Sequence, residues 1–308
     1  MLEDECEWHG VTCQDEAIST NGTIVNAVIG LELPSNEMNT KIPADFVLLQ
    51  SLSTLDVSDN TMEQDLSSYS WKSMVGMEVL RLDGNKFTGE ISIFLELPVT
   101  LQVLSIGTNG FTGTIPEGLN IFQALTEINM EKNQLSGTIS DVFTDLNVTT
   151  LRIGENNFTA NAFPVFFYTM TQLEVLGLGA VNINTEIEGA LEQLQQLRVL
   201  EIYGNPLNGT IPNVVLAMTS LEERRNFLNG VLPDTLGGLD ALRIFDVQFN
   251  QLSGQVPDAV GQWNDTITYI EFSNNTFTGS IPSSICSTQI ETLVADCDVS
   301  CTCCTECV

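Results

Sequence analysis

The sequence predicts an α/β repeat solenoid with one long parallel β-sheet and about 11 repeats. Three observations carry this prediction: a pattern LxxLxLxxNxLxGxIP that recurs along the chain, a leucine alternation of period two inside it, and cysteines confined to the two chain ends. No cysteine falls between Cys13 and Cys286. A regular array can extend over all 308 residues as one unit, whereas ordinary domains would number about two.

The repeat is clearest where two copies are compared. Residues 101–116 read LQVLSIGTNGFTGTIP, and residues 197–212 read LRVLEIYGNPLNGTIP. The LxL alternation predicts a short strand with one buried face. One repeat cannot bury its own apolar face, so copies must stack. We therefore expect aligned parallel strands about 4.8 Å apart.

One asparagine per repeat stands where the chain is expected to leave the strand. Its amide can bond backbone groups of the turn that would otherwise be buried without partners. Val181 occupies this slot in one repeat, and we expect the ladder of bonds to be weaker there. The slot asparagines are Asn36, Asn60, Asn85, Asn109, Asn133, Asn156, Asn205, Asn226, Asn250 and Asn275.

The second half of the repeat places a glycine before Ile-Pro. Glycine permits a backbone conformation that a Cβ would forbid, and proline ends the outer turn or strand. Ala160 and Thr185 replace this glycine, which predicts less regular repeats there. The glycines that fit are Gly89, Gly113, Gly137, Gly209, Gly230, Gly254 and Gly279.

The charge is lopsided, with 40 Asp and Glu against 10 Lys and Arg, and the formal net charge is −30. Nucleic acid is excluded as a partner, because phosphate binding requires a basic stripe. An anionic membrane surface would repel the chain. A basic peptide, a basic protein or divalent cations would be attracted, or the acidity serves solubility alone.

The cysteines and the glycosylation sequons favour an oxidising, extracellular or cell-surface location. Six C-terminal cysteines allow 15 pairings, and Cys304-x-x-Cys307 also matches half of a zinc site, although disulfides are favoured. The cysteines are Cys6, Cys13, Cys286, Cys297, Cys301, Cys303, Cys304 and Cys307. Asn-x-Ser/Thr sequons begin at Asn21, Asn147, Asn157, Asn208, Asn264 and Asn274.

The N-terminus shows no signal peptide, and no apolar run reaches about 18 residues. We expect a signal that was removed or truncated, and a longer parent with a membrane anchor or kinase stays open. The single histidine, His9, lies in the N-terminal segment, so a histidine-based catalytic site is not expected. The scattered carboxylates do not indicate a glycosidase. The sequence therefore predicts no enzyme, no cofactor and no metal.

The segment Cys6-Glu-Trp-His-Gly-Val-Thr-Cys13 resembles the CxWxGVxC cap of plant-type extracellular leucine-rich-repeat proteins. That family includes receptor-like proteins, receptor kinase ectodomains and polygalacturonase-inhibiting proteins. The resemblance implies a right-handed curved superhelix whose concave sheet or flank binds protein, peptide or glycan, and a Cys6–Cys13 bond. It divides the chain into an N-terminal cap (1–23), the array (24–285) and a Cys-rich C-terminal cap (286–308). The tail is similar to Cys-rich tails of algal leucine-rich-repeat proteins.

A candidate binding patch lies in the later repeats, where aromatic and arginine side chains gather. Such residues are favoured in binding hot spots. The face is expected to be bare near Gly177, Gly179 and Ala180. The candidate binding residues are Glu201, Tyr203, Glu222, Arg224, Asp246 and Phe249.

The eighth repeat is irregular, because Glu223 stands in a normally inward apolar slot. A buried lone carboxylate is costly unless paired, so Arg224 or Arg225 is expected to pair with it after a local distortion. Two interpretations stay open: a degenerate repeat with a salt bridge, and the recognition patch itself.

The leading functional prediction is a non-catalytic extracellular recognition module that serves cell-surface signalling or defence. The alternatives are an inhibitor of a secreted hydrolase and a structural or adhesive wall protein that binds cations. Inhibition of secreted glycanases would indicate the first alternative, and calcium-dependent self-association the second.

Overall fold

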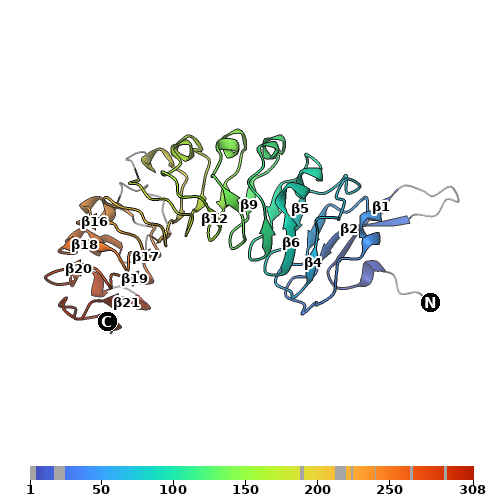
Figure 1. Cartoon of the computed structure of the whole chain (residues 1–308). Coiled ribbons are helices and arrows are strands. Elements are labelled where there is room, and N and C mark those ends of the chain that lie inside the picture. The colour runs from blue at the N-terminus through green and yellow to red at the C-terminus, as the bar shows by residue number, and fades with distance from the viewer. Residues whose placement is uncertain are drawn as a thin grey trace. The chain divides into compact units, whose positions relative to one another are not determined.

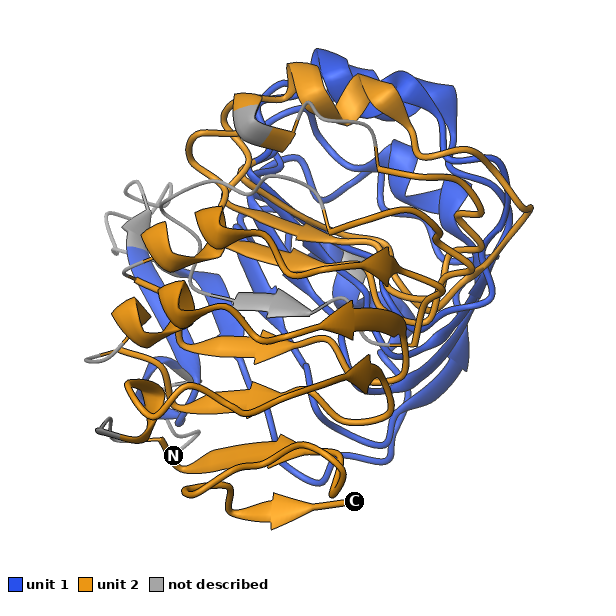
Figure 2. Ribbon diagram, turned by 90° about the vertical axis from the view of Figure 1, so that its left-hand side faces the viewer, with its two compact units in different colours: residues 1–148 blue, residues 149–308 orange. Residues whose placement is uncertain are grey.

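The computed structural model describes residues 5–16, 25–187, 191–211, 220–222, 225–239, 241–263, 266–287 and 290–308. The chain divides into two compact units, residues 1–148 and 149–308 (Figures 1 and 2). The boundary between them falls inside the predicted array, and the predicted division into two caps and one array stays a prediction.

Unit 1 contains a main sheet of short strands in the order β1-β2-β3-β5-β7-β9. β1 (Val11–Glu16) pairs antiparallel with β2 (Val25–Glu32). The later strands are parallel, and equivalent leucines such as Leu31, Leu55 and Leu80 lie in register. The prediction of stacked parallel strands is confirmed. These strands are β3 (Thr54–Asp56), β5 (Val79–Arg81), β7 (Val103–Ser105) and β9 (Glu127–Asn129).

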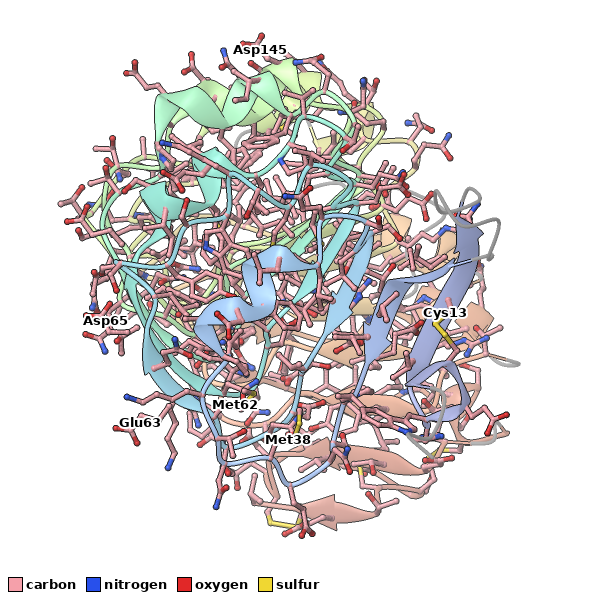
Figure 3. All side chains as sticks on the ribbon, turned by 90° about the vertical axis from the view of Figure 1, so that its right-hand side faces the viewer. Cys13, Met38, Met62, Glu63, Asp65 and Asp145 are labelled. Atoms are coloured by element: carbon pink, nitrogen blue, oxygen red, sulfur yellow. A yellow bond between two sulfur atoms is a disulfide. The ribbon has the colours of Figure 1, made fainter. Side chains whose placement is uncertain are left out.

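A second, smaller sheet of unit 1 comes from the other half of the repeat. It joins β4 (Glu63–Asp65), β6 (Lys86–Glu90) and β8 (Gly110–Thr112). Glu63 and Asp65 are exposed on β4 (Figure 3). Two-residue β10 (Ser136–Gly137) follows in the same half of the next repeat.

Unit 2 repeats the same plan. Its main strands are β11 (Thr150–Arg152), β13 (Val175–Gly177), β14 (Val199–Glu201), β15 (Ser220–Glu222), β17 (Ile244–Asp246), β19 (Tyr269–Glu271), β21 (Thr292–Ala295) and β22 (Glu306–Cys307). All of these pair in parallel. Its second-sheet strands are β12 (Asn157–Phe158), β16 (Asn229–Gly230), β18 (Gln251–Gly254) and β20 (Thr276–Phe277).

The helical segments of the described residues are all short 3-10 helices rather than α-helices. They are η1 (Glu5–Glu7), η2 (Ala44–Leu48), η3 (Ile91–Glu96), η4 (Glu117–Ile121) and η5 (Asp141–Asp145) in unit 1. In unit 2 they are η6 (Val165–Thr169), η7 (Leu191–Gln193), η8 (Asp234–Gly238), η9 (Asp258–Trp263) and η10 (Ile285–Ser287). A 3-10 helix rises about 2.0 Å per residue, so a few residues suffice to cross the back of a repeat.

The slot asparagines form the expected ladder. Asn205 donates to the carbonyls of Leu178 (2.7 Å) and Ile202 (2.8 Å), and its Oδ1 accepts from the backbone N–H groups of Val181 (2.9 Å) and Ile183 (3.1 Å). The Asn205 side chain therefore satisfies backbone groups of two successive repeats, which would otherwise be buried without partners.

Val181 fills its slot with a buried apolar side chain. The carbonyls of Ile153, Leu178 and Gly179 each receive another donor, from Asn156, Asn205 and the Glu155 N–H. The asparagine ladder therefore has fewer hydrogen bonds at Val181, although these three carbonyls still have donors. The expected local loss of stability at this repeat stays a prediction.

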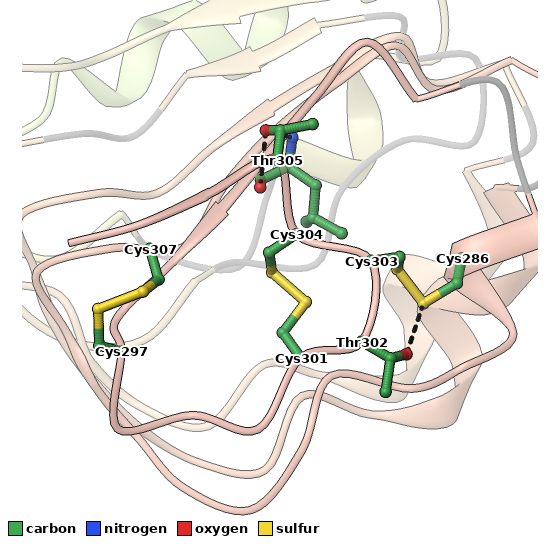
Figure 4. The surroundings of a disulfide bond; sticks show 9 residues. Cys286, Cys297, Cys301, Thr302, Cys303, Cys304, Thr305 and Cys307 are labelled. Carbon is green, nitrogen blue, oxygen red and sulfur yellow. Dashed lines mark hydrogen bonds between the residues drawn. A yellow bond between two sulfur atoms is a disulfide. The ribbon is translucent and has the colours of Figure 1, made fainter.

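All eight cysteines form disulfides. Cys6 bonds Cys13 in the N-terminal cap, which agrees with the resemblance. In the tail the pairs are Cys286–Cys303, Cys297–Cys307 and Cys301–Cys304 (Figure 4). Thr305 bonds the backbone of Leu293, which ties the tail to β21. The prediction that the cysteines at both ends form disulfides, rather than a zinc site, is therefore confirmed.

Candidate ligand-binding face

The exposed face of the main sheet in unit 2 carries a first column of side chains, one from each strand. Alternate residues of a strand point to opposite faces, so this column is fixed by the register. It runs through Arg152, Gly177, Glu201, Glu222, Asp246 and Glu271. The Glu222 side chain lies outside the described residues. Four carboxylate-bearing residues therefore stand on four adjacent strands, β14 to β19.

An ion pair crosses one strand of this face. Arg152 on β11 pairs with Glu201 on β14, and Gly177 on the intervening β13 lies beneath them. A Cβ on Gly177 would stand 3.0 Å from Arg152 Cγ and 3.1 Å from Glu201 Oε2. The two side chains are 27% and 16% exposed, so solvent screens this pair less than an open surface pair.

A second bridge runs beside the first. The Tyr203 hydroxyl donates to Glu155 Oε1 at 2.7 Å. The Tyr203 ring lies over Gly179, where an added Cβ would approach Cζ to 2.6 Å. Both Gly177 and Gly179 are buried, so the expectation of a bare face at these glycines is wrong. The absence of a Cβ lets side chains from neighbouring strands cover the backbone.

Next to Tyr203 the face is hollowed by a pocket of about 350 Å³. This volume is within the range of about 300–1,000 Å³ typical of ligand sites. One side carries the bonded pair of Glu155 and Tyr203, and Arg225 and Gln248 complete the wall. The lining residues, from five successive repeats, are Glu155, Ala180, Tyr203, Gly204, Arg225 and Gln248.

Arg225, which lines this pocket, also contacts Phe249 at the edge of the pocket. The Arg225 guanidinium lies 5.7 Å from the centroid of the Phe249 ring, a cation–π contact. Both residues have left-handed backbones, with φ of 57° and 55°. They directly precede slot asparagines Asn226 and Asn250, and this conformation recurs before the slot along the array. Phe249 is 45% exposed, which leaves a large ring available to a partner.

Two acids of the column are buried in the face. Asp246 is 1% exposed and accepts bonds from the Gln248 N–H and amide, both at 3.3 Å. Glu271, in register with Asp246 on the next strand, is 7% exposed. Burial raises the pKa of Glu271, its bonds from Ser273 oppose the rise, and the Asp246 charge adds to it. A nearby cation would favour the ionised form of Glu271.

The corresponding face of unit 1 is occupied by its own polar pairs. Arg81 donates two bonds to Glu127, at 2.8 and 2.9 Å. Asp83 Oδ1 accepts from Ser105 (2.6 Å) and Asn129 (3.0 Å). Burial raises the pKa of Asp83, and its bonds from Ser105 and from the Gly107 N–H oppose the rise. The large hollow of unit 1, about 850 Å³, lies instead along the second sheet between residues of β4, β6 and β8.

The structure brings part of the predicted patch together. Tyr203 lines the pocket, Phe249 contacts its rim, Glu201 bonds Arg152, and Asp246 is buried in the face. Arg224 and Glu223 lie outside the described residues. The predicted patch did not include Arg152, Glu155, Arg225 and Gln248, which the structure places at the pocket and the bridges. One sequence pattern could have indicated these contacts. It is a glycine on one strand with side chains on the two neighbouring strands that can form an ion pair or a hydrogen bond with each other.

Four described sequon asparagines, Asn147, Asn157, Asn208 and Asn274, are exposed, as glycosylation would require. Asn21 and Asn264 lie outside the described residues. His9 is exposed in the N-terminal cap. Within the described ranges, no group of three or more His, Cys, Asp or Glu residues is arranged to hold a metal ion. The described part of the chain also has no helix with the length and apolar character needed to span a membrane.

Comparisons with known proteins agree with this architecture. A family model described as Leucine Rich Repeat matches residues 266–288. Receptor-like protein 39 of Arabidopsis thaliana is 26% identical over 172 residues, covering 46% of this chain and 19% of its own length. Receptor-like protein 19 of the same plant is 32% identical over 135 residues, covering 42% and 13%. The chain thus spans a fifth or less of these relatives.

Among solved structures, the Arabidopsis receptor kinase HAESA, in complex with the peptide hormone IDA and the co-receptor SERK1, superposes with a TM-score of 0.77 at 27% identity. The match covers 94% of this chain and 47% of the HAESA chain. The repeat pattern, the parallel strands and the capping disulfides make the chain a leucine-rich-repeat solenoid, and these likenesses show that it is similar to plant receptor-like proteins and receptor kinase ectodomains.

Proposed function

We propose that unit 2 binds an extended peptide with basic residues across the exposed face of its main sheet. One peptide side chain occupies the pocket beside Tyr203. The observation that carries this proposal is that pocket, whose walls come from five repeats and include the Tyr203–Glu155 bond. A preorganised pocket reduces the conformational entropy that binding costs.

The chemistry of the face indicates the ligand class. Carboxylates on β14, β17 and β19 attract cationic side chains, and the net charge of −30 accelerates their approach. Tyr203 and Phe249 offer aromatic surface, while Gln248 and Arg225 can bond peptide carbonyls. The similarity to HAESA, which is solved in complex with a peptide hormone, supports a peptide rather than a glycan. We place the protein outside the cell on the same likeness.

A selection experiment tests the proposal. Short linear peptides displayed on phage are selected on the wild-type protein, and the affinities of synthetic copies are measured by calorimetry. Basic peptides should be enriched, and Tyr203→Ala or Arg225→Ala should weaken their binding about tenfold, or about 1.4 kcal/mol. Thr278→Ala is the matched control, because Thr278 is exposed in the second-sheet half of its repeat.

Salt gives an independent measurement. Affinity should fall as NaCl rises from about 50 mM to about 300 mM, because salt screens the long-range attraction between the acidic protein and a basic peptide. Equal affinities in wild type and both alanine variants would remove the pocket from the proposal. Suppression of a secreted polygalacturonase without any peptide selection would favour the inhibitor alternative.

A further inference from the structure

A second pocket of unit 2, of about 390 Å³, lies where the repeats depart from their consensus. Thr185, which replaces the usual glycine, accepts a bond from the Phe163 N–H at 3.0 Å. Glycine could not make this bond. Thr185, where the repeat departs from its consensus, is therefore part of the pocket wall.

The pocket combines an apolar floor with a polar rim. Phe163 and Tyr168 stack with ring centroids 5.4 Å apart and an angle of 20° between their planes. Both are buried, and Val165 beside them is 61% exposed. Asn184 and Glu186 supply amide and carboxylate groups on the rim. An apolar surface beside hydrogen-bonding groups suits a pyranose ring, which has C–H faces and a polar edge.

The same pocket is lined by a glycosylation sequon. Asn208 of Asn208-Gly209-Thr210 contributes to the wall, and its side chain is exposed. The Glu186 side chain lies over the next residue, since a Cβ on Gly209 would meet Glu186 Cγ at 2.6 Å. A sugar attached to Asn208 would start inside the pocket, with Glu186 beside it.

We infer that this pocket holds the first N-acetylglucosamine of an N-glycan on Asn208. In the transfer, Asn208 Nδ2 bonds to the sugar C1, the bond from C1 to the phosphate oxygen of a lipid diphosphate-linked oligosaccharide breaks, and the amide proton leaves with the lipid diphosphate. The tether supplies a high effective concentration, so the sugar occupies the pocket even where a free sugar would bind weakly. This inference does not depend on peptide binding.

The inference is tested on the glycoprotein secreted by a eukaryotic host. The native protein is digested with a peptide N-glycosidase, and glycan loss at each sequon is followed by mass spectrometry. The glycan on Asn208 should be released about tenfold more slowly than those on Asn157 and Asn274, a difference of about 1.4 kcal/mol. The controls are exposed sequons of the same unit, and denaturation should equalise all three rates.

A wall variant locates the protection. Val165→Ser replaces an exposed apolar wall residue, and it should speed release at Asn208 alone. The inference is overturned if Asn208 stays unmodified while Asn157 and Asn274 carry glycans, if the native rates are equal, or if Val165→Ser leaves protection unchanged. Binding of free N-acetylglucosamine to a Thr210→Ala variant, together with no protection at Asn208, would reassign the pocket to an external ligand.

Discussion

Gly177 and Gly179 decide which side chains can cross β13. Arg152 and Tyr203 each bond a carboxylate two strands away, and each passes over a residue without a Cβ. Neither glycine has a positive φ, so alanine is compatible with both backbones. Replacing either glycine therefore tests steric access alone, without backbone strain.

Gly179→Ala should displace the Tyr203 ring and break its bond to Glu155. We expect a loss of about 1 kcal/mol in unfolding free energy, the usual value of one hydrogen bond, and about tenfold weaker peptide binding. Urea denaturation and calorimetric titration measure the two effects. Gly76→Ala is the control, because its nearest neighbour would stand 3.6 Å away. Unaltered peptide affinity in Gly179→Ala would separate Tyr203 from the site.

Glu271 gives the face a pH dependence. Burial raises its pKa in the folded state, so the folded protein holds a proton at pH values where the unfolded chain has lost it. This contribution to stability is complete below the unfolded pKa and is lost as pH rises through the folded pKa. Glu271→Gln keeps an oxygen for Ser273 but removes the charge. We expect it to stabilise at pH 7 by roughly 1 kcal/mol.

The measurement is the midpoint of urea unfolding at pH 5 and pH 7. The Gln variant should be stabilised more at pH 7 than at pH 5, because the stability that comes from the raised pKa of Glu271 is lost as pH rises. A matched variant is Glu291→Gln, whose residue is exposed. An equal change at both pH values would show that Glu271 does not titrate in this range.

At the scale of elements, the asparagine ladder connects each repeat to the one before it. Asn205→Val should cost roughly 3–5 kcal/mol, since the Val181 and Ile183 N–H groups lose their acceptor. Val181 shows that a valine fits such a slot, so steric strain is not the cause. Asn85→Val should cost about 1 kcal/mol less, because its neighbouring slots keep asparagine. Equal midpoints of chemical denaturation for Asn205→Val and Asn85→Val would show that a neighbouring valine slot does not increase the cost.

Most of the element plan was predictable from the sequence, because leucine spacing alone determines strand position and register. The asparagine slots and terminal disulfides were predictable for the same reason of strict recurrence. The bridges over Gly177 and Gly179 were not, since they depend on rotamers that reach two strands away. The 3-10 form of the helices, and one pairing among 15 for the tail, depend on packing that a repeat pattern does not encode.

The tail disulfides close loops of very different length. Cys286 and Cys303 are 17 residues apart, whereas Cys301 and Cys304 are 3 apart. In the chain-entropy model the longer loop stabilises by about 3 kcal/mol and the shorter by about 2 kcal/mol. The double serine variant at Cys286 and Cys303 should therefore melt lower than that at Cys301 and Cys304. Calorimetry decides between them, and the reverse order would exclude the loop-length explanation.

At the scale of the whole molecule, the chain has 40 acidic residues and 10 basic ones, so repulsion between like charges destabilises the folded state. NaCl should raise the melting temperature by a few degrees between about 20 mM and about 200 mM, because the Debye length falls to about 7 Å. If screening of charge is the cause, CaCl2 at equal ionic strength should raise the melting temperature no more than NaCl does. Calorimetry and light scattering in the two salts measure stability and association together. A calcium-specific rise in melting temperature, or calcium-dependent association, would instead favour the adhesive wall-protein alternative over a recognition module.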